Sequence, residues 1–295
     1  MRSDPIAIFD SGLGGLTVVR QVMRRLPAEN IVYFGDTARV PYGIKSAETV
    51  TRFVRENIEF LQTFRPKLII AACNTASAAA LPRLNGEYDF PLCGVVEPGA
   101  RAAVRRTRNG RIGVIGTEAT IGSGSYARRI AALDPAIEVF SRACPLIVPL
   151  VEEGRTSSDP IVEMALAEYL RPLCEAGVDT IVLGCTHYPL LKAAIKRAAG
   201  LRVQVIDSAR ETAAVAEETL DAAGARADAG STGRAQFFAS DHVERFTAIG
   251  RRFLGKALGE VCLVQPIHVG NGMVLRPAAG GLHADAAMPQ PSSNR

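Results

Sequence analysis

Two cysteines occupy matching places in the two halves of the chain. Each ends an apolar run and precedes a polar pair: Cys73 is followed by Asn74-Thr75, and Cys185 by Thr186-His187. A thiolate accepts a proton and a thiol donates one, so two such groups converging on a small molecule can act as base and acid. The pattern favours proton-transfer chemistry, although a disulfide, a metal site or two packed thiols would show the same residues.

The setting of these cysteines predicts their reactivity. A thiol where a strand passes into a helix lies near unpaired helix amides, which stabilise the thiolate and lower the pKa of the thiol from about 8.5. Thr75, Ser77 or Thr186 are candidates to cap those helices. His187 is a candidate to hold a proton near Cys185 or to orient a substrate carboxylate. The other cysteines are expected to pack in the interior; they are Cys93, Cys144, Cys174 and Cys262.

A glycine-rich turn, Asp10-Ser11-Gly12-Leu13-Gly14-Gly15, follows the first apolar run. It lacks the third glycine of G-x-G-x-x-G and the Lys of a phosphate-binding loop, and its carboxylate would repel phosphate. We expect the glycines to let backbone amides approach a small ligand, and Asp10 to receive an ammonium group or assist a thiol. The alternative is that Asp10 and Ser11 only cap the helix that starts near Gly15.

Two further segments are candidates for the same site. Tyr42-Gly43 lies in a loop beyond the second expected strand, where the glycine would expose backbone amides to a ligand. Glu152 is a carboxylate in an expected loop that would face the second thiol. Taken alone, the first is an ordinary turn and the second a solvated side chain, so both depend on the fold to bring them to the cysteines.

Short β-branched runs alternate with amphipathic stretches long enough for crossover helices, such as those over 47–64 and 160–176. This order predicts an α/β fold of mainly parallel sheets flanked by helices, whose ligands bind beyond the carboxyl ends of the strands. The expected strands cover residues 6–9, 31–34, 68–71, 92–96, 112–115, 137–140, 180–183, 203–206 and 236–239.

The two halves of the chain resemble each other. A polar turn, Asp10-Ser11 or Gly116-Thr117, follows the first strand of each half, and a strand end with a cysteine comes next at similar spacing. We therefore expect two similar domains that face each other across a cleft holding the active site. The expected extents are 1–97 plus 208–265 for the first domain, 98–207 for the second, and 276–295 for a tail of disordered composition.

Composition narrows the class of protein. The chain has 295 residues, 47% hydrophobic and 22% charged, as suits a globular protein of two domains. A net charge of +4 rests on scattered arginines without interleaved aromatics, which argues against a nucleic-acid partner. The six cysteines show no C-x-x-C spacing, which argues against structural zinc. Without a signal peptide or a run long enough to span a bilayer, the protein is expected to be cytoplasmic, with reduced thiols and no membrane partner.

Four motifs together resemble those of the glutamate racemases, the cofactor-independent enzymes that make D-glutamate for bacterial peptidoglycan. They are Asp10-Ser11-Gly-Leu-Gly-Gly, Val40-Pro41-Tyr42-Gly43, Ala-Cys73-Asn74-Thr75-Ala-Ser and Gly-Cys185-Thr186-His187-Tyr-Pro. The motifs agree with those of the family in order and spacing, and only the tail beyond Leu275 lies outside the resemblance. Four matching motifs are far more specific than any one of them.

The resemblance implies racemisation of glutamate without metal or cofactor, with Cys73 and Cys185 as the acid/base residues. It implies that Asp10, Glu152 and His187 assist the thiols, and that two domains close over glutamate. The implied substrate contacts are Asp10, Ser11, Tyr42, Gly43, Asn74, Thr75, Thr186 and His187. Glutamate is the expected partner and a homodimer the expected assembly. The residues alone leave a lysine Schiff base as an alternative.

Three other functions fit the same residues. An aspartate or related amino-acid racemase would use the same two thiols, whereas a thiol redox protein would join them in a reversible disulfide. A non-catalytic module would only bind an amino acid in the cleft. In the mechanism we favour, one cysteine deprotonates one enantiomer while the other donates a proton from the opposite face. The resemblance implies that Cys73 deprotonates D-glutamate and that Cys185 deprotonates L-glutamate.

Overall fold

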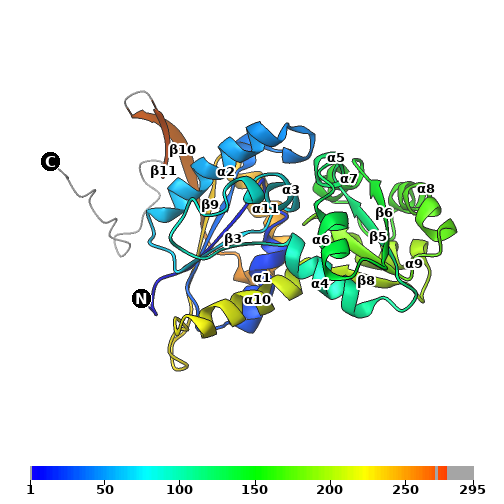
Figure 1. Cartoon of the computed structure of the whole chain (residues 1–295). Helices are drawn as coiled ribbons and strands as arrows, with labels where there is room; N and C mark the ends of the chain where they lie inside the picture. The colour runs from blue at the N-terminus through cyan, green and yellow to red at the C-terminus, as the bar shows by residue number, and fades with distance from the viewer. Residues whose placement is uncertain (1, 270–271, 278–295) are drawn as a thin grey trace.

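The computed structural model describes residues 2–269 and 272–277 and places them in two α/β lobes side by side (Figure 1). One lobe holds a seven-stranded sheet and the other a four-stranded sheet. The first sheet comprises β1 (Ile6–Asp10), β2 (Ile31–Gly35), β3 (Leu68–Ala71), β4 (Leu92–Gly94), β9 (Ala235–Ala239), β10 (Val261–Val269) and β11 (Gly272–Pro277). The second comprises β5 (Arg111–Gly116), β6 (Glu138–Ala143), β7 (Thr180–Gly184) and β8 (Gln204–Asp207). The predicted fold class is confirmed.

Helices flank both sheets, and their sequences show why they begin where they do. The helix α2 begins after Ser46, whose hydroxyl accepts a hydrogen bond from the Thr49 amide, and it buries one apolar stripe. The helix α8 begins with Pro160 directly after the capping residue Asp159. The helices are α1 (Leu16–Arg25), α2 (Ala47–Gln62), α3 (Asn74–Ala79), α4 (Val96–Arg106), α5 (Glu118–Gly122), α6 (Ser125–Leu133), α7 (Ile147–Glu152), α8 (Pro160–Glu175), α9 (Lys192–Ala199), α10 (Ser208–Ala222) and α11 (Val243–Leu254).

The strand β1 shows where the core of the first lobe lies. Ile6 and Ile8 pack into one apolar cluster, and Ala7 and Phe9 into another on the opposite face of the sheet. All four are fully buried. Because helices cover both faces, the strand is a continuous apolar run rather than an alternating one.

Both sheets change strand order around their first strand. In the order β11-β10-β9-β2-β1-β3-β4, the chain moves from β1 to β2 on one side and then to β3 on the other, and in β6-β5-β7-β8 it does the same around β5. The strand pairs are parallel except for β10 with β11. Sheets of this kind bind ligands at the carboxyl ends of the strands where the order reverses. These are the ends of β1 and β3 in one lobe, and of β5 and β7 in the other.

Two expected elements differ from the structure. The strand expected over 92–96 ends at Gly94, and Val96 already begins α4, because Pro98 suits the first turn of a helix, where no amide donor is needed. The β10–β11 hairpin is absent from the expected strands. Its first strand pairs with β9, a partner that the local sequence does not identify.

The predicted domain boundaries and tail have different outcomes. In the structure the chain enters the second lobe along α4 and leaves it after β8, the edge strand of the second sheet. The boundaries 1–97 plus 208–265 and 98–207 stay a prediction. Most of the tail over 276–295 lies outside the described residues, but Arg276 and Pro277 end β11 and are not part of a disordered segment.

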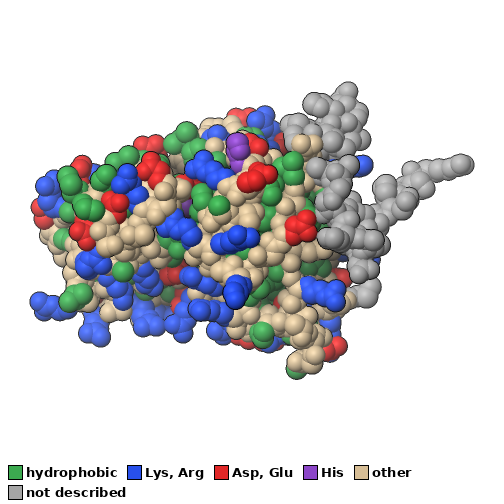
Figure 2. All heavy atoms as spheres, turned by 180° about the vertical axis from the view of Figure 1, so that it is seen from behind, with side chains coloured by type: hydrophobic (Ala, Val, Ile, Leu, Met, Phe, Trp, Pro, Cys, Tyr) green, Lys and Arg blue, Asp and Glu red, His purple; other side chains and the backbone are tan. Residues whose placement is uncertain are grey.

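The outside of the molecule carries many basic side chains, which are spread over the face shown in Figure 2 and gather along its lower edge. Several pair with carboxylates, such as Arg25 with Glu217 and Arg105 with Glu211. Exposed pairs of this kind each contribute about 0–1 kcal/mol to stability. None of the helices in the described ranges combines the length and the apolar character needed to cross a membrane.

Candidate active site

Both special cysteines line one small cavity at the junction of the lobes. Cys73 is the residue before α3, and Cys185 directly follows β7. They are 5% and 6% exposed, and the cavity measures about 30 Å³. Its lining consists of Ser11, Val40, Pro41, Tyr42, Gly43, Cys73, Asn74, Thr75, Thr117, Val148, Gly184, Cys185, Thr186 and His187. The structure thus brings all the predicted site residues except Asp10 and Glu152 to its wall.

Asp10 and Glu152 lie one layer behind the wall. Asp10 ends β1 and is fully buried. Glu152 is not in a loop, as the sequence led us to expect, but is the last residue of α7. The proline in this segment, Pro149, lies early in α7, where a helix tolerates the missing amide. Asp10 lies beside Cys73, and Glu152 lies beside His187, the neighbour of Cys185.

The Asp10 carboxylate joins the two lobes. Its Oδ2 accepts a hydrogen bond of 2.7 Å from the Gly15 amide and one of 3.4 Å from the Thr186 hydroxyl of the second lobe. Asp10 therefore holds the start of α1, as the capping alternative proposed, and also reaches the second thiol's loop. Burial raises the pKa of Asp10, while the positive charge of His187 and the amides of Gly15 and Ser11 act against this increase.

The predicted lowering of the thiol pKa is wrong for Cys73. Burial raises its pKa to about 12, and the negative charge of Asp10 acts in the same direction. The amide of Ala76 in α3 and the nearby Ser11 hydroxyl, 3.7 Å from Cys73 Sγ, act the other way but are outweighed. Cys73 is therefore a protonated thiol at neutral pH and can donate a proton.

The surroundings of Cys185 are opposite in charge. His187 Nδ1 lies 3.9 Å from Cys185 Sγ, and His187 Nε2 lies 3.2 Å from Glu152 Oε1. Burial alone lowers the pKa of His187, but its bonds to Cys185 and Glu152 outweigh burial and raise the pKa to about 10. His187 is thus an imidazolium that lies beside Cys185 Sγ. The residues after His187, Tyr188–Leu191, form only a 3-10 turn, so the predicted α-helix amides are not directly behind this thiol.

Hydroxyl and amide groups from both lobes supply hydrogen bonds at the cavity. Thr75 Oγ1 lies 3.0 Å from Thr117 Oγ1 and 3.2 Å from Thr120 Oγ1. Asn74 Oδ1 accepts a hydrogen bond of 2.7 Å from the Tyr126 hydroxyl, while Asn74 Nδ2 is buried without a partner among the described residues. A buried amide donor left unpaired is costly unless a ligand completes it. The arrangement suits a carboxylate ligand.

Thr117 is absent from the residues predicted for the site. It follows β5 at the carboxyl end, and its hydroxyl accepts a hydrogen bond from the Thr120 amide at the start of α5. The rule that located Asp10-Ser11 after β1 applies equally to Gly116-Thr117 after β5. The repeated polar turn was the signal that could have identified it.

Gly14 in the first turn and Gly43 in the second loop lie where the two lobes touch. A Cβ added to Gly14 would lie 2.4 Å from Thr186 Oγ1 and 2.6 Å from His187 Nδ1. A Cβ on Gly43 would lie 2.7 Å from Thr117 Cβ. Gly14 and Gly43 therefore admit side chains of the other lobe and set how closely the lobes approach. The expected approach of backbone amides to a ligand stays a prediction.

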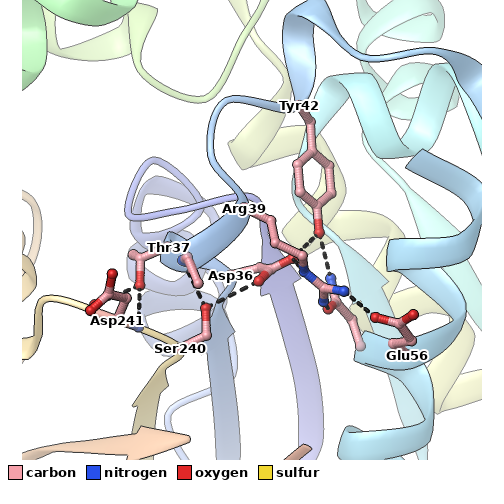
Figure 3. Close-up of polar contacts among 9 residues, drawn as sticks. Asp36, Thr37, Arg39, Tyr42, Glu56, Ser240 and Asp241 are labelled. Carbon is pink, nitrogen blue, oxygen red and sulfur yellow. Dashed lines mark hydrogen bonds and ion pairs between the residues drawn. The ribbon is translucent and has the colours of Figure 1, made fainter. Parts of the chain in front are cut away.

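A buried polar network holds Tyr42 (Figure 3). The Tyr42 hydroxyl donates to the Asp36 carboxylate and accepts a 3.1 Å hydrogen bond from Asn57 Nδ2. Asp36 also accepts from Arg39 Nε at 2.7 Å and from the Ser240 hydroxyl at 3.0 Å. The network ties the ends of β2 and β9 to α2. Because the Tyr42 hydroxyl is occupied here, the ring and backbone are what Tyr42 presents to the cavity.

Known proteins share this fold and these motifs. A family model described as Asp/Glu/Hydantoin racemase matches residues 14–216. A glutamate racemase of Geobacter metallireducens is 51% identical over 87% of this chain and 94% of its own. This chain belongs to the glutamate racemase family. It is accordingly an isomerase that acts on an amino acid. A second glutamate racemase, of Syntrophus aciditrophicus, is 48% identical over 88% of this chain and 96% of its own.

Solved glutamate racemases share the architecture. An isoform from Bacillus anthracis aligns with a TM-score of 0.86 and 42% identity over 90% of this chain and 98% of its own. A glutamate racemase from Francisella tularensis, solved in complex with D-glutamate, aligns with a TM-score of 0.83 and 35% identity. The alignment covers 90% of this chain and 98% of the Francisella chain. The family and the two-lobed fold are therefore shown by sequence and by structure.

Replacing Glu152 with Gln should lower the pKa of His187, because the carboxylate that stabilises the imidazolium is lost. An NMR titration of ¹⁵N-labelled histidine measures this pKa, since the chain has only four His, and His187→Gln identifies the signal. The matched control is Glu153→Gln, whose carboxylate contacts Arg155 instead. An unchanged titration in Glu152→Gln would contradict the coupling of these two residues.

Replacing Gly43 with Ala should keep the lobes from closing fully, because the new methyl group would overlap Thr117. Overpacking costs about 1–3 kcal/mol, so we expect racemase activity to fall about tenfold or more while each lobe stays folded. Gly122→Ala is the control, since a Cβ there meets nothing within 4 Å. Kinetic assays measure the loss of activity, and a urea unfolding curve measures any loss of stability. Equal activity in both variants would show that close approach at Gly43 is not required.

Proposed function

We propose that this chain interconverts L- and D-glutamate by a two-base mechanism in which Cys73 and Cys185 act on opposite faces of the α-carbon. The observation that carries the proposal is that both thiols line one cavity while each has its own charged neighbour. Asp10 stands beside Cys73, and His187 with Glu152 stands beside Cys185. Inversion requires a proton to leave one face and another to arrive at the opposite face, so two separate carriers are needed.

The charges around the two thiols favour one starting arrangement of protons. The protonated thiol of Cys73 is ready to donate, and the imidazolium of His187 stabilises negative charge on Cys185. The resemblance to the glutamate racemases assigns the L-enantiomer to Cys185. In the direction from L- to D-glutamate, the Cys185 thiolate thus removes the α-proton and Cys73 delivers its proton to the other face. The products are D-glutamate, a Cys185 thiol and a Cys73 thiolate. The reverse direction exchanges these roles, so protons and charge balance in both.

The difficult step is the formation of a carbanion without an imine to spread its charge. Donors fixed around the substrate carboxylates supply this stabilisation in a cavity from which water is excluded. Asn74 Nδ2, which has no partner among the described residues, is one donor. The Ser11, Thr75 and Thr186 hydroxyls at the cavity wall are others. The proposal requires no cofactor.

Substrate access requires the lobes to separate. The closed cavity measures about 30 Å³. A water molecule needs about 10–15 Å³ of cavity volume, so this cavity holds little more than two waters and cannot hold a glutamate. The contacts that close the cavity join different lobes, such as Thr75 with Thr117 and Asp10 with Thr186. Glutamate therefore binds to an opened form, and closure brings the two thiols to it.

Either Cys73→Ala or Cys185→Ala should abolish racemisation, by about a thousandfold or more, because one face of the α-carbon loses its proton carrier. The assay is racemisation of L- and D-glutamate by reduced protein without added cofactor, together with α-proton exchange in deuterated water. Unchanged circular dichroism would show that the variants fold.

The same assays separate the alternatives. Faster exchange with aspartate than with glutamate would indicate an aspartate racemase. Activity that reductant abolishes would indicate a redox protein. Glutamate binding without turnover in the unaltered protein would indicate a binding module.

We further propose that the chain supplies D-glutamate for peptidoglycan synthesis in the cytoplasm. The proposal rests on the racemase assignment, since the glutamate of the cell-wall peptide is the D-enantiomer. A plasmid carrying the unaltered chain should let a bacterial strain that requires D-glutamate grow without it, and the Cys73→Ala chain should not. Growth with both would contradict the proposal. The homodimer expected from the sequence stays a prediction.

A further inference from the structure

One face of α11, a helix of the first lobe, meets the residues that assist Cys185 in the second lobe. The Phe253 ring stands edge-on to the His187 ring, with centroids 6.4 Å apart and planes at 90°. Arg245 Nη2 lies 3.6 Å from Glu152 Oε2. Arg252 Nη1 and Nη2 donate hydrogen bonds of 3.3 and 3.4 Å to the carbonyls of Val151 and Arg155. None of these three α11 residues lines the catalytic cavity.

The spacing of the three residues explains how one helix makes all these contacts. Arg252 and Phe253 lie seven and eight positions after Arg245, which is two helical turns, so the three side chains share one face. Phe253 is 2% exposed, while the two arginines reach from the rim of the interface. Arg251, on the same helix, is exposed and makes none of these contacts.

We propose that Arg245, Arg252 and Phe253, together called the α11 clasp, are positioning residues that hold the His187–Glu152 pair against Cys185 when the lobes close. The proposal rests on the racemase function proposed above. Phe253 restricts rotation of the imidazole ring and keeps water from it. Arg245 binds the Glu152 oxygen that His187 does not use, and Arg252 binds carbonyls on both sides of Glu152, so the carboxylate is fixed in place.

The clasp serves only one of the two thiols. Asp10, the neighbour of Cys73, accepts its hydrogen bonds from Gly15 and Thr186 and from no clasp residue. Loosening the clasp should therefore slow proton transfer at Cys185 more than at Cys73. The equilibrium constant of a racemisation is one, so kcat/KM must fall by the same factor in both directions. Isotope effects, which report the individual proton transfers, distinguish the two thiols.

The test uses glutamate deuterated at the α-carbon, with Arg245→Gln, the double variant Arg245→Gln/Arg252→Gln, Arg245→Lys as the conservative variant and Arg251→Gln as the matched control. Exposed ion pairs are worth up to about 1 kcal/mol, so kcat/KM should fall about two- to fivefold in Arg245→Gln and further in the double variant. The isotope effect should rise in the direction in which Cys185 removes the deuteron and fall in the other. Arg245→Lys and Arg251→Gln should stay close to the unaltered enzyme.

Three outcomes are distinguishable. An isotope effect that rises in the direction in which Cys185 removes the deuteron, and falls in the other direction, supports the clasp. Isotope effects equal to those of the unaltered enzyme in both directions overturn it, even if activity falls, because a variant with less folded protein loses rate without changing either effect. Failure of the unaltered protein to racemise glutamate would instead refute the proposed function on which the clasp rests.

Discussion

The close approach of the two lobes is the constraint on which the rest of the site depends. At Gly14 the space for a side chain is filled by Thr186 and His187, and at Gly43 it is filled by Thr117. With any larger residue at these positions, the strand ends of the two sheets would stand further apart. Their approach buries both thiols and excludes water, and electrostatic interactions are stronger in such an interior than in solvent.

This burial makes the two thiols unequal. Cys73 lies beside the carboxylate of Asp10, and burial and that negative charge both keep it protonated. Cys185 lies beside His187, whose positive charge is maintained by Glu152. In the mechanism proposed above, a reaction whose substrate and product are mirror images is carried out by two thiols in opposite electrostatic surroundings. The asymmetry follows from which lobe supplies the neighbour: Asp10 lies in the lobe of Cys73, and Glu152 in that of Cys185.

Much of the arrangement could be read from the chain, because parallel α/β folds put their ligands at strand ends. Cys73, Cys185 and Asp10-Ser11 stand directly after apolar runs, so their convergence follows from the order of the strands. Thr117 obeys the same rule, but its turn also marks the repetition of the two halves, and that pattern alone does not assign it to the site. The hairpin of β10 and β11 was missed for another reason: β10 pairs with β9, and local periodicity carries no information about that partner.

Taken alone, the sequence determined the α/β fold class, the two thiols and the polar residues beside them, because these features depend on local pattern and strand order. Only the tertiary structure decided the charge state around each thiol. The helix amides that were expected to lower the pKa of Cys73 are outweighed by burial and by Asp10, and both effects depend on distance and desolvation. It also decided the role of α11, since Arg245 and Phe253 are far from His187 in the chain and meet its surroundings only when the lobes are together.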